Sequence, residues 1–287
     1  MLPEISRVCA TVIVERNKKV IIKAFCENGL KGIRLILHKF TKQLILQQFF
    51  FKMKKLLIAS TSTLHNSGYL DYMLEALIVF FKSTENIVFV EYARPSGLTL
   101  TAYTEIVRKA FNKIGKKVIG LHEFKNPEKA LIKAKGIFVG GGNSFVLLNE
   151  LYKLNLMQTL KSVILSGTPY LGTSAGGNIC GQSIGTSNDM PIVYPPSFEA
   201  LGIIPFNINP HYIDPNPERK HMGETRATRI KEFHHYNSQS VLGLREGSYL
   251  EINGDKILLK GSLKACVFKQ GVLRYEIDSG TDLSSFK

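Results

Sequence analysis

From residue 53 onward, short apolar runs alternate with longer segments in which apolar residues recur every three or four positions. Short apolar runs bounded by turn residues are typical of buried strands, and the longer period is that of an amphipathic helix. The predicted strands are 56–60, 87–92, 118–121 and 136–139, and the predicted helices are 67–82, 100–114 and 127–135. These elements follow one another in the order of successive βαβ units.

This alternation predicts an α/β fold of three layers, with a mostly parallel, doubly wound sheet and helices on both faces. Right-handed crossovers bring the carboxyl ends of the parallel strands to one edge, where functional residues of such sheets collect. After about residue 240 the runs become short and are separated by turns such as Asn253-Gly254, which predicts a C-terminal antiparallel β meander added to the sheet. Its predicted strands are 241–244, 249–252, 256–259, 264–268 and 272–276.

The first 52 residues differ from the rest of the chain. They are basic and apolar in turn without a helical or strand period, and Met53 then opens a segment typical of the first strand of an α/β protein. We therefore predict a basic N-terminal extension over residues 1–52 and a folded domain over residues 53–287. We interpret the extension as sequence outside the domain, such as translation from an upstream start codon; a targeting or membrane-surface arm is the functional alternative.

The formal net charge of +14 over 287 residues raises the question of a nucleic-acid partner. Residues 1–52 hold ten Lys or Arg and three Glu, so half of the excess charge lies in less than a fifth of the chain. No zinc-finger, helix-turn-helix or RNA-binding signature accompanies it. We expect no nucleic-acid partner.

Cysteine usage and hydropathy narrow the class of protein further. The four cysteines are Cys9, Cys26, Cys180 and Cys266. Their wide spacing argues against a disulfide framework and a zinc site and favours a reducing, cytoplasmic location. The apolar segment 43–51 is too short to cross a membrane. His234 and His235 are adjacent, and neighbouring positions on a helix do not face one target, so we expect no metal. We also expect no cofactor and no membrane partner.

The stretch Gly172-Thr173-Ser174-Ala175-Gly176 has the G-x-S-x-G pattern of a nucleophile elbow. A short apolar run precedes it and a small-residue segment follows, as expected where a strand turns sharply into a helix. The serine at such a turn is exposed to a substrate carbonyl, and the N–H of Ala175 at the new helix N-terminus is placed to bind an oxyanion. Five-residue patterns recur by chance, so the rest of the chain has to supply a base and a second oxyanion donor.

A second glycine-rich turn, Gly140-Gly141-Gly142-Asn143, ends the predicted strand 136–139. No Lys-Ser/Thr follows in the register of a phosphate-binding loop. The N–H groups of Gly141 or Gly142 are the better interpretation, as the second half of an oxyanion hole. An ordinary tight turn capped by Asn143 is the alternative.

His211, in Asn209-Pro210-His211, follows an apolar run and is the best-placed general base, because a neutral imidazole accepts a serine proton near pH 7. Asp189 and Glu246 lie in loops beside apolar segments, and either could orient the imidazole. The residues alone do not choose between them. Arg226 and Arg229 could bind a substrate carboxylate or lie on a solvated helix face.

Taken together, these motifs resemble peptidase E, the α-aspartyl dipeptidase family of serine peptidases. The resemblance runs from about Met53 to Phe268. It is carried by Ser60-Thr61-Ser62-Thr63, by the Gly140 and Gly172 stretches above, by Thr186-Ser187-Asn188-Asp189-Met190-Pro191, by Asn209-Pro210-His211, by Gly223-Glu224-Thr225-Arg226 and by Gly247-Ser248-Tyr249. Such proteins resemble class I glutamine amidotransferases in fold, with serine in place of the nucleophilic cysteine.

The resemblance implies a serine dipeptidase that hydrolyses Asp-Xaa through an acyl-enzyme. Ser174 is then the nucleophile and His211 the base, with Asp189 or Glu246 as the third member. Arg226 and Asn143 become candidate substrate contacts, and the partner is a small dipeptide, with a monomer or a small homo-oligomer expected. The alternatives are a cyanophycinase-like exopeptidase acting on β-Asp-Arg, a glutaminase-type amidotransferase domain and a non-catalytic binding protein of the same fold.

Overall fold

The computed structural model describes residues 10–14, 20–24, 54–95, 97–215 and 223–286. Two strands lie in the N-terminal extension, β1 (Ala10–Val14) and β2 (Val20–Ala24), and they pair antiparallel with each other. The sequence had shown no strand period there. The apolar segment 43–51 and the remainder of the extension lie outside the described residues.

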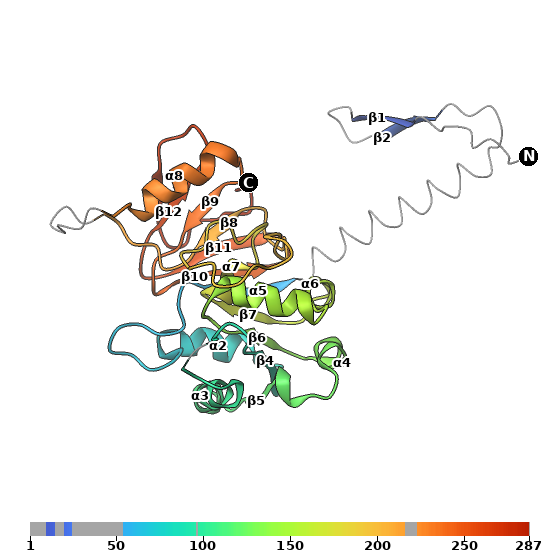
Figure 1. Ribbon diagram of the computed structural model, residues 1–287, viewed down its shortest axis with the longest axis vertical. Coiled ribbons are helices and arrows are strands. Elements are labelled where there is room, and N and C mark those ends of the chain that lie inside the picture. Colours follow the sequence, from blue (N-terminus) through green and yellow to red (C-terminus); the bar gives the residue numbers. More distant parts are fainter. Residues whose placement is uncertain (1–9, 15–19, 25–53, 96, 216–222, 287) are drawn as a thin grey trace, which may run out of the picture. The chain divides into compact units, whose positions relative to one another are not determined.

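A seven-stranded sheet forms the centre of the main unit, in the order β11-β10-β3-β7-β6-β4-β5 (Figure 1). Five of its strands are parallel: β3 (Lys55–Ala59), β4 (Asn86–Val90), β5 (Lys117–Gly120), β6 (Ile137–Val139) and β7 (Tyr170–Thr173). Two more, β10 (Ser248–Asn253) and β11 (Lys256–Gly261), add to it antiparallel beside β3. The four predicted strands before residue 140 are therefore confirmed to within two residues at each end.

Side chains of the parallel strands alternate between two separate cores. Leu56 and Ile58 of β3 enter one core, whereas Leu57 of the same strand enters the other. In β6, Val139 and Phe138 divide in the same way. Strands buried on both faces need apolar residues at every position, which explains why they appear in the sequence as continuous runs instead of alternating ones.

Helices cover both faces of the sheet, as the sequence predicted. One face carries the helices α4 (Pro127–Lys133), α5 (Ser144–Lys153), α6 (Met157–Leu165) and α7 (Ala175–Asn178), and the other carries α2 (Leu74–Phe80) and α3 (Leu100–Asn112). The short 3₁₀ helices η1 (Asp71–Met73) and η2 (Leu121–Glu123) complete the connections.

Polar caps fix the start of several of these helices. Thr99 begins α3 by accepting the N–H of Ala102, and Asn126 begins α4, with Pro127 in the first turn.

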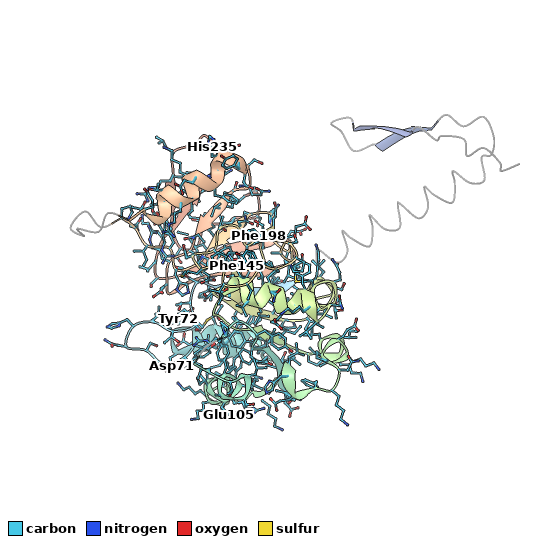
Figure 2. The ribbon with its side chains drawn as sticks, in the orientation of Figure 1. Asp71, Tyr72, Glu105, Phe145, Phe198 and His235 are labelled. Atoms are coloured by element: carbon cyan, nitrogen blue, oxygen red, sulfur yellow. The ribbon has the colours of Figure 1, made fainter. Side chains whose placement is uncertain are left out.

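The loop after α7 packs back onto the helices of one face, where the ring of Phe198 meets that of Phe145 on α5 at 5.5 Å between centroids (Figure 2).

A second sheet departs from the single meander expected at the C-terminus. Its order is β13-β12-β9-β8, built from β8 (Asn207–Asn209), β9 (Val241–Gly243), β12 (Ala265–Phe268) and β13 (Tyr275–Ile277). Four of the five strands predicted after residue 240 form to within two residues at each end, whereas the predicted strand 272–276 overlaps β13 only at residues 275 and 276. Strands β10 and β11 join the main sheet, while β9, β12 and β13 join β8. Strand periodicity reports which face of a strand is buried and does not report its partner, so this division lies beyond the sequence pattern.

Helix α8 (Arg226–Tyr236) packs on the second sheet (Figure 1). Ile230 of α8 lies in a small core with Tyr212 and Val241. Strand β7 belongs to the main sheet and β8 to the second sheet, so the turns that follow these two strands lie at the ends of different sheets.

We expect Gly176→Ala to be more destabilising than Gly177→Ala, although the two residues are neighbours on α7. A Cβ at Gly176 would lie 2.2 Å from the carbonyl oxygen of Val139, whereas a Cβ at Gly177 would first meet a side-chain methyl of Ile58 at 3.0 Å. Helix propensity favours both changes equally, so the difference reports packing. Denaturant unfolding should show Gly176→Ala less stable than Gly177→Ala by about 1–3 kcal/mol. Equal free energies of unfolding would contradict this account of the turn.

Candidate active site

Ser174 occupies the turn between β7 and α7. Its backbone has φ 51° and ψ −111°, a region that residues with a Cβ rarely adopt. The turn is this tight because Gly172 lies against the backbone of Gly176, where a Cβ would come within 2.3 Å of the carbonyl oxygen. The N–H of Ser174 donates to the carbonyl of Ala59 at the end of β3. The predicted strand–serine–helix turn is therefore present, at the carboxyl edge of the parallel strands.

His211 reaches the serine from the second sheet. It follows β8 and Pro210, and its Nε2 lies 2.8 Å from the Ser174 hydroxyl oxygen. The backbone of His211 is also in the left-handed region, with φ 52°. Its N–H donates to the hydroxyl of Ser60 at 2.8 Å, and that hydroxyl donates to the carbonyl of Leu244 at 2.7 Å.

Ser60 is thus a positioning residue to which the sequence assigned no role. It is fully buried and directly follows β3, at the same edge of the sheet as Ser174. Position just past a parallel strand is the signal that could have identified it, because those strand ends converge.

The two candidate carboxylates lie in different places. Glu246 Oε1 is 2.6 Å from His211 Nδ1, so the hydrogen bonds run from the carboxylate through the imidazole to the serine hydroxyl. Asp189 instead accepts the N–H of Ser144 at 2.7 Å, in the first turn of α5, and the hydroxyl of Ser187 at 2.8 Å. The structure therefore brings Glu246 to the histidine, while Asp189 binds a helix N-terminus, a favourable place for an anion.

Arg245 anchors the loop that carries Glu246. Its guanidinium donates to the carbonyl of Lys264 and to the carboxylates of Asp214 and Glu276, at 2.6–2.8 Å. The hydrogen bonds from Arg245 hold the pKa of Glu276 below its usual range. Burial alone would raise the pKa of Asp214, but Arg245 and Arg274 outweigh it and lower that pKa. The Glu246 side chain is 47% exposed, so burial does not hold it in place. The contacts of the neighbouring Arg245 order the loop instead.

The glycine loop lies directly against the nucleophile. A Cβ on Gly141 would be 3.0 Å from that of Ser174, and a Cβ on Gly142 would be 2.2 Å from the carbonyl oxygen of Ala93. Gly142 has φ 143°, so both space and conformation require glycine there. Among the hydrogen bonds of the described residues, none uses the N–H of Gly141, Gly142 or Ala175. Three backbone donors next to the serine are thereby left for a substrate oxygen.

Asn143 ends the same loop with both side-chain polar atoms engaged. Its Oδ1 accepts the N–H groups of Phe145 and Val146 and so caps α5, and its amide donates to the carbonyl of Met190 at 2.8 Å. Asn143 therefore ties the glycine loop to the segment that holds Asp189.

Arg226 begins α8 and has a buried Nη1 without a hydrogen-bond partner among the described residues. Burial lowers the pKa of this arginine and the neighbouring Arg229 lowers it further, whereas Glu246 and Asp189 raise it. Arginine stays protonated under all ordinary conditions. Arg226 therefore carries a positive charge that has no ion-pair partner among the described residues and that interacts with both loop carboxylates.

No other nucleophile or metal group competes with this arrangement in the described part of the chain. Cys180 lies two residues beyond the end of α7, and burial raises the pKa of its thiol to about 12, so it stays protonated. No group of three or more His, Cys, Asp or Glu residues in the described ranges is placed to hold a metal ion. His234 is buried and its Nε2 contacts the carbonyl of Gln239. No helix among the described residues is long and apolar enough to cross a membrane.

A serine hydroxyl bonded to an imidazole, itself bonded to a carboxylate, at the carboxyl edge of a parallel sheet defines an α/β serine hydrolase. Comparison with known proteins specifies the class further. The chain belongs to peptidase family S51, whose family model matches residues 56–260.

Curated relatives align with most of the chain. Peptidase E of Streptomyces coelicolor is 46% identical over 229 residues, which cover 80% of this chain and 93% of the relative. A protein of Drosophila melanogaster named "probable alpha-aspartyl dipeptidase" is 47% identical over 219 residues, covering 75% of this chain and 90% of the relative. A solved structure of a peptidase from an acI-B1 actinobacterium shares the fold, with a TM-score of 0.59 at 17% identity over 80% of this chain and 96% of that one.

We expect Ser60→Ala to lower the activity of the enzyme by misplacing His211. The change removes the only acceptor that the described residues offer to the His211 N–H, and it removes one of the two donors to the Leu244 carbonyl, the other being the Tyr212 N–H. Leaving the His211 N–H unpaired costs about 1–3 kcal/mol. If the contact between His211 and Ser174 is weakened by this amount, turnover should fall roughly 5- to 150-fold. Steady-state kinetics on an Asp-Xaa dipeptide measure this effect.

Ser60→Thr, which keeps the hydroxyl, is the matched control and should retain more activity than Ser60→Ala. Wild-type turnover by Ser60→Ala would contradict the positioning role.

Proposed function

We propose that this chain is a serine exopeptidase that releases aspartate from Asp-Xaa dipeptides. The observation that carries the proposal is the continuous hydrogen-bonded series from Glu246 through His211 to Ser174, in a chain of family S51. The names of the relatives from Streptomyces and Drosophila support an aspartyl dipeptide as the substrate.

The reaction is acyl transfer to Ser174 followed by hydrolysis. The Ser174 oxygen attacks the carbonyl carbon of the aspartyl residue while His211 Nε2 takes the hydroxyl proton. His211 then gives this proton to the leaving amine as the C–N bond breaks, and an aspartyl ester remains on Ser174. A water molecule attacks the ester with His211 again as base, and aspartate leaves as the serine regains its proton. The free N–H groups of Gly141, Gly142 and Ala175 stabilise the oxyanion in both steps.

Glu246 is the proposed third member of the triad. Its contact with His211 Nδ1 keeps the proton on that nitrogen, leaves Nε2 free to accept, and stabilises the imidazolium. We propose that Asp189 acts at longer range. Its hydrogen bond to the first turn of α5 orders the loop that carries Asn143. Its negative charge also interacts with the positive charge of Arg226.

Arg226 is the proposed ligand of the aspartyl side-chain carboxylate. A guanidinium forms two parallel hydrogen bonds to a carboxylate, and the buried Nη1 of Arg226 has no partner among the described residues. The free α-amine of the substrate would find its counter-charge in the nearby carboxylates Asp189 and Glu246. Because the Asn143 side chain is already engaged, we propose that it shapes the site and that Arg226 supplies the specificity.

We also propose that residues 53–287 form the catalytic domain and that residues 1–52 lie outside it. The S51 match begins at residue 56, next to the start of β3. Cys180 and Cys266 are both free thiols, which suits a reducing compartment and supports a cytoplasmic location.

Ser174→Ala should abolish hydrolysis of Asp-Leu, since no other described group can form the acyl-enzyme. Loss of a triad nucleophile lowers turnover by roughly 10⁴- to 10⁶-fold. Release of leucine measures the reaction, and a thermal unfolding curve shows whether the variant is folded. Hydrolysis of Asp-Leu at the wild-type rate by Ser174→Ala would overturn the proposal, and wild-type preference for β-Asp-Arg over Asp-Leu would indicate a cyanophycinase-like substrate.

Glu246→Gln and Asp189→Asn are nearly isosteric changes that should act on different quantities. Glu246→Gln removes the charge that stabilises the imidazolium, and kcat should fall by roughly 10²- to 10⁴-fold. Asp189→Asn weakens an N-terminal contact of α5, and the free energy of unfolding should fall by about 1 kcal/mol with a smaller loss of kcat. A larger loss of kcat in Asp189→Asn than in Glu246→Gln would reverse the assignment.

A further inference from the structure

A second arginine, Arg94, lies beside the glycine loop. It follows Ala93, whose carbonyl accepts the N–H of Asn143 at 2.7 Å and touches Gly142 so closely that no Cβ would fit there. The Arg94 guanidinium lies over the ring of Tyr103, 4.6 Å from the ring centroid. The Tyr103 hydroxyl donates in turn to the carbonyl of Gly141 at 3.0 Å. Arg94 is therefore linked to the loop that carries the proposed oxyanion donors in two ways, through the carbonyl of the preceding Ala93 and through the side chain of Tyr103.

Arg94 has no ion pair with any described residue, and its Nε is buried without a hydrogen-bond partner. Two other partly buried arginines are neutralised: Arg108 pairs with Glu105 and Glu123, and Arg245 pairs with Asp214 and Glu276. A guanidinium held on an aromatic face without an ion pair, and with one unpartnered donor, is prepared for a planar anion. Arg226 likewise keeps one buried nitrogen, Nη1, without a hydrogen-bond partner among the described residues.

The two halves of an Asp-Xaa dipeptide differ in charge. The aspartyl half carries an ammonium group and a carboxylate, whereas the leaving half carries only the terminal carboxylate. Arg226 lies in the field of Asp189 and Glu246, which suits the half with both signs. Arg94 lies on the ring of Tyr103, whose neutral hydroxyl contacts that of Tyr69 and donates to the glycine loop, and such neutral neighbours suit the half with negative charge alone.

We propose that Arg94 binds the terminal carboxylate of the leaving residue and thereby selects dipeptides. The proposal rests on the proposed aspartyl dipeptidase function. Adding one residue to the substrate would move the terminal carboxylate by about 3.5 Å, beyond the reach of a guanidinium held on the Tyr103 ring. Blocking the carboxylate as an amide would remove the charge without changing the length.

The test compares hydrolysis of Asp-Leu and Asp-Leu-amide by wild type and by Arg94→Gln. Wild type should prefer the free acid, and Arg94→Gln should lose about 10- to 100-fold in kcat/KM for Asp-Leu, mainly through KM. Its kcat/KM for Asp-Leu-amide should change less than about 3-fold, because that substrate has no charge for Arg94 to bind. Arg94→Lys, which keeps the charge, should retain part of the preference for the acid.

Two further variants separate this role from others. Lys109→Gln removes one positive charge from an exposed position of α3, the helix that carries Tyr103, and should leave both substrates unaffected. Arg226→Gln should lower kcat/KM for Asp-Leu and Asp-Leu-amide alike and should reduce the preference for Asp-Leu over Asn-Leu.

Equal losses on acid and amide in Arg94→Gln would overturn the proposal and leave Arg94 as a support of Tyr103. A loss of Asp-over-Asn preference in Arg94→Gln would assign it to the aspartyl half instead, which also overturns the proposal. Absence of turnover of both substrates by folded wild type would overturn the proposed function itself, and the role of Arg94 with it.

Discussion

The close approach of β7 to α7 is the constraint on which the rest of the site depends. Gly172 and Gly176 allow backbone to meet backbone at this turn, and Gly176 also lies against Val139 of the neighbouring strand. The chain can pass from strand to helix only by holding Ser174 at a positive φ. That conformation costs about 1–3 kcal/mol, and the surrounding sheet has to sustain it. The same turn directs the serine hydroxyl outward and leaves the Ala175 N–H beside it.

The partners of Ser174 come from elsewhere and meet it because two sheets adjoin at one edge. His211 follows β8 of the second sheet, and Glu246 lies between β9 of that sheet and β10 of the main sheet. Ser60, at the end of β3, accepts the His211 N–H and so joins the sheets at the point of chemistry. These two hydrogen bonds of Ser60 hold the backbone of His211 in place, whereas the Glu246 side chain that orients the imidazole is 47% exposed.

The positive charges near the site bear on which substrate it can bind. The charge excess of the chain says little about function, because half of it belongs to residues 1–52. What matters is which positive charges lack a counter-charge within the domain. Arg245 is engaged in ordering the Glu246 loop, whereas Arg94 and Arg226 each keep one buried nitrogen for which the described part of the chain offers no hydrogen-bond partner. Burying such donors is costly unless an anion is bound for part of the reaction cycle, which agrees with a small acidic substrate.

Local sequence patterns were enough to predict the parallel α/β sheet, the covering helices and the turn around Ser174, because these depend on local periodicity and on glycine spacing. They also identified His211, because a residue just past the end of a strand is expected at the edge of the sheet where functional residues collect. They left Asp189 and Glu246 equivalent, because both are loop carboxylates beside apolar runs, and they left Ser60 and Arg94 without a role. Only the tertiary structure separated them: β10 and β11 join one sheet and β9 and β12 the other, so that Glu246 meets His211 while Asp189 meets α5. Strand partners and loop contacts arise from residues far apart in the chain, and no local pattern records them.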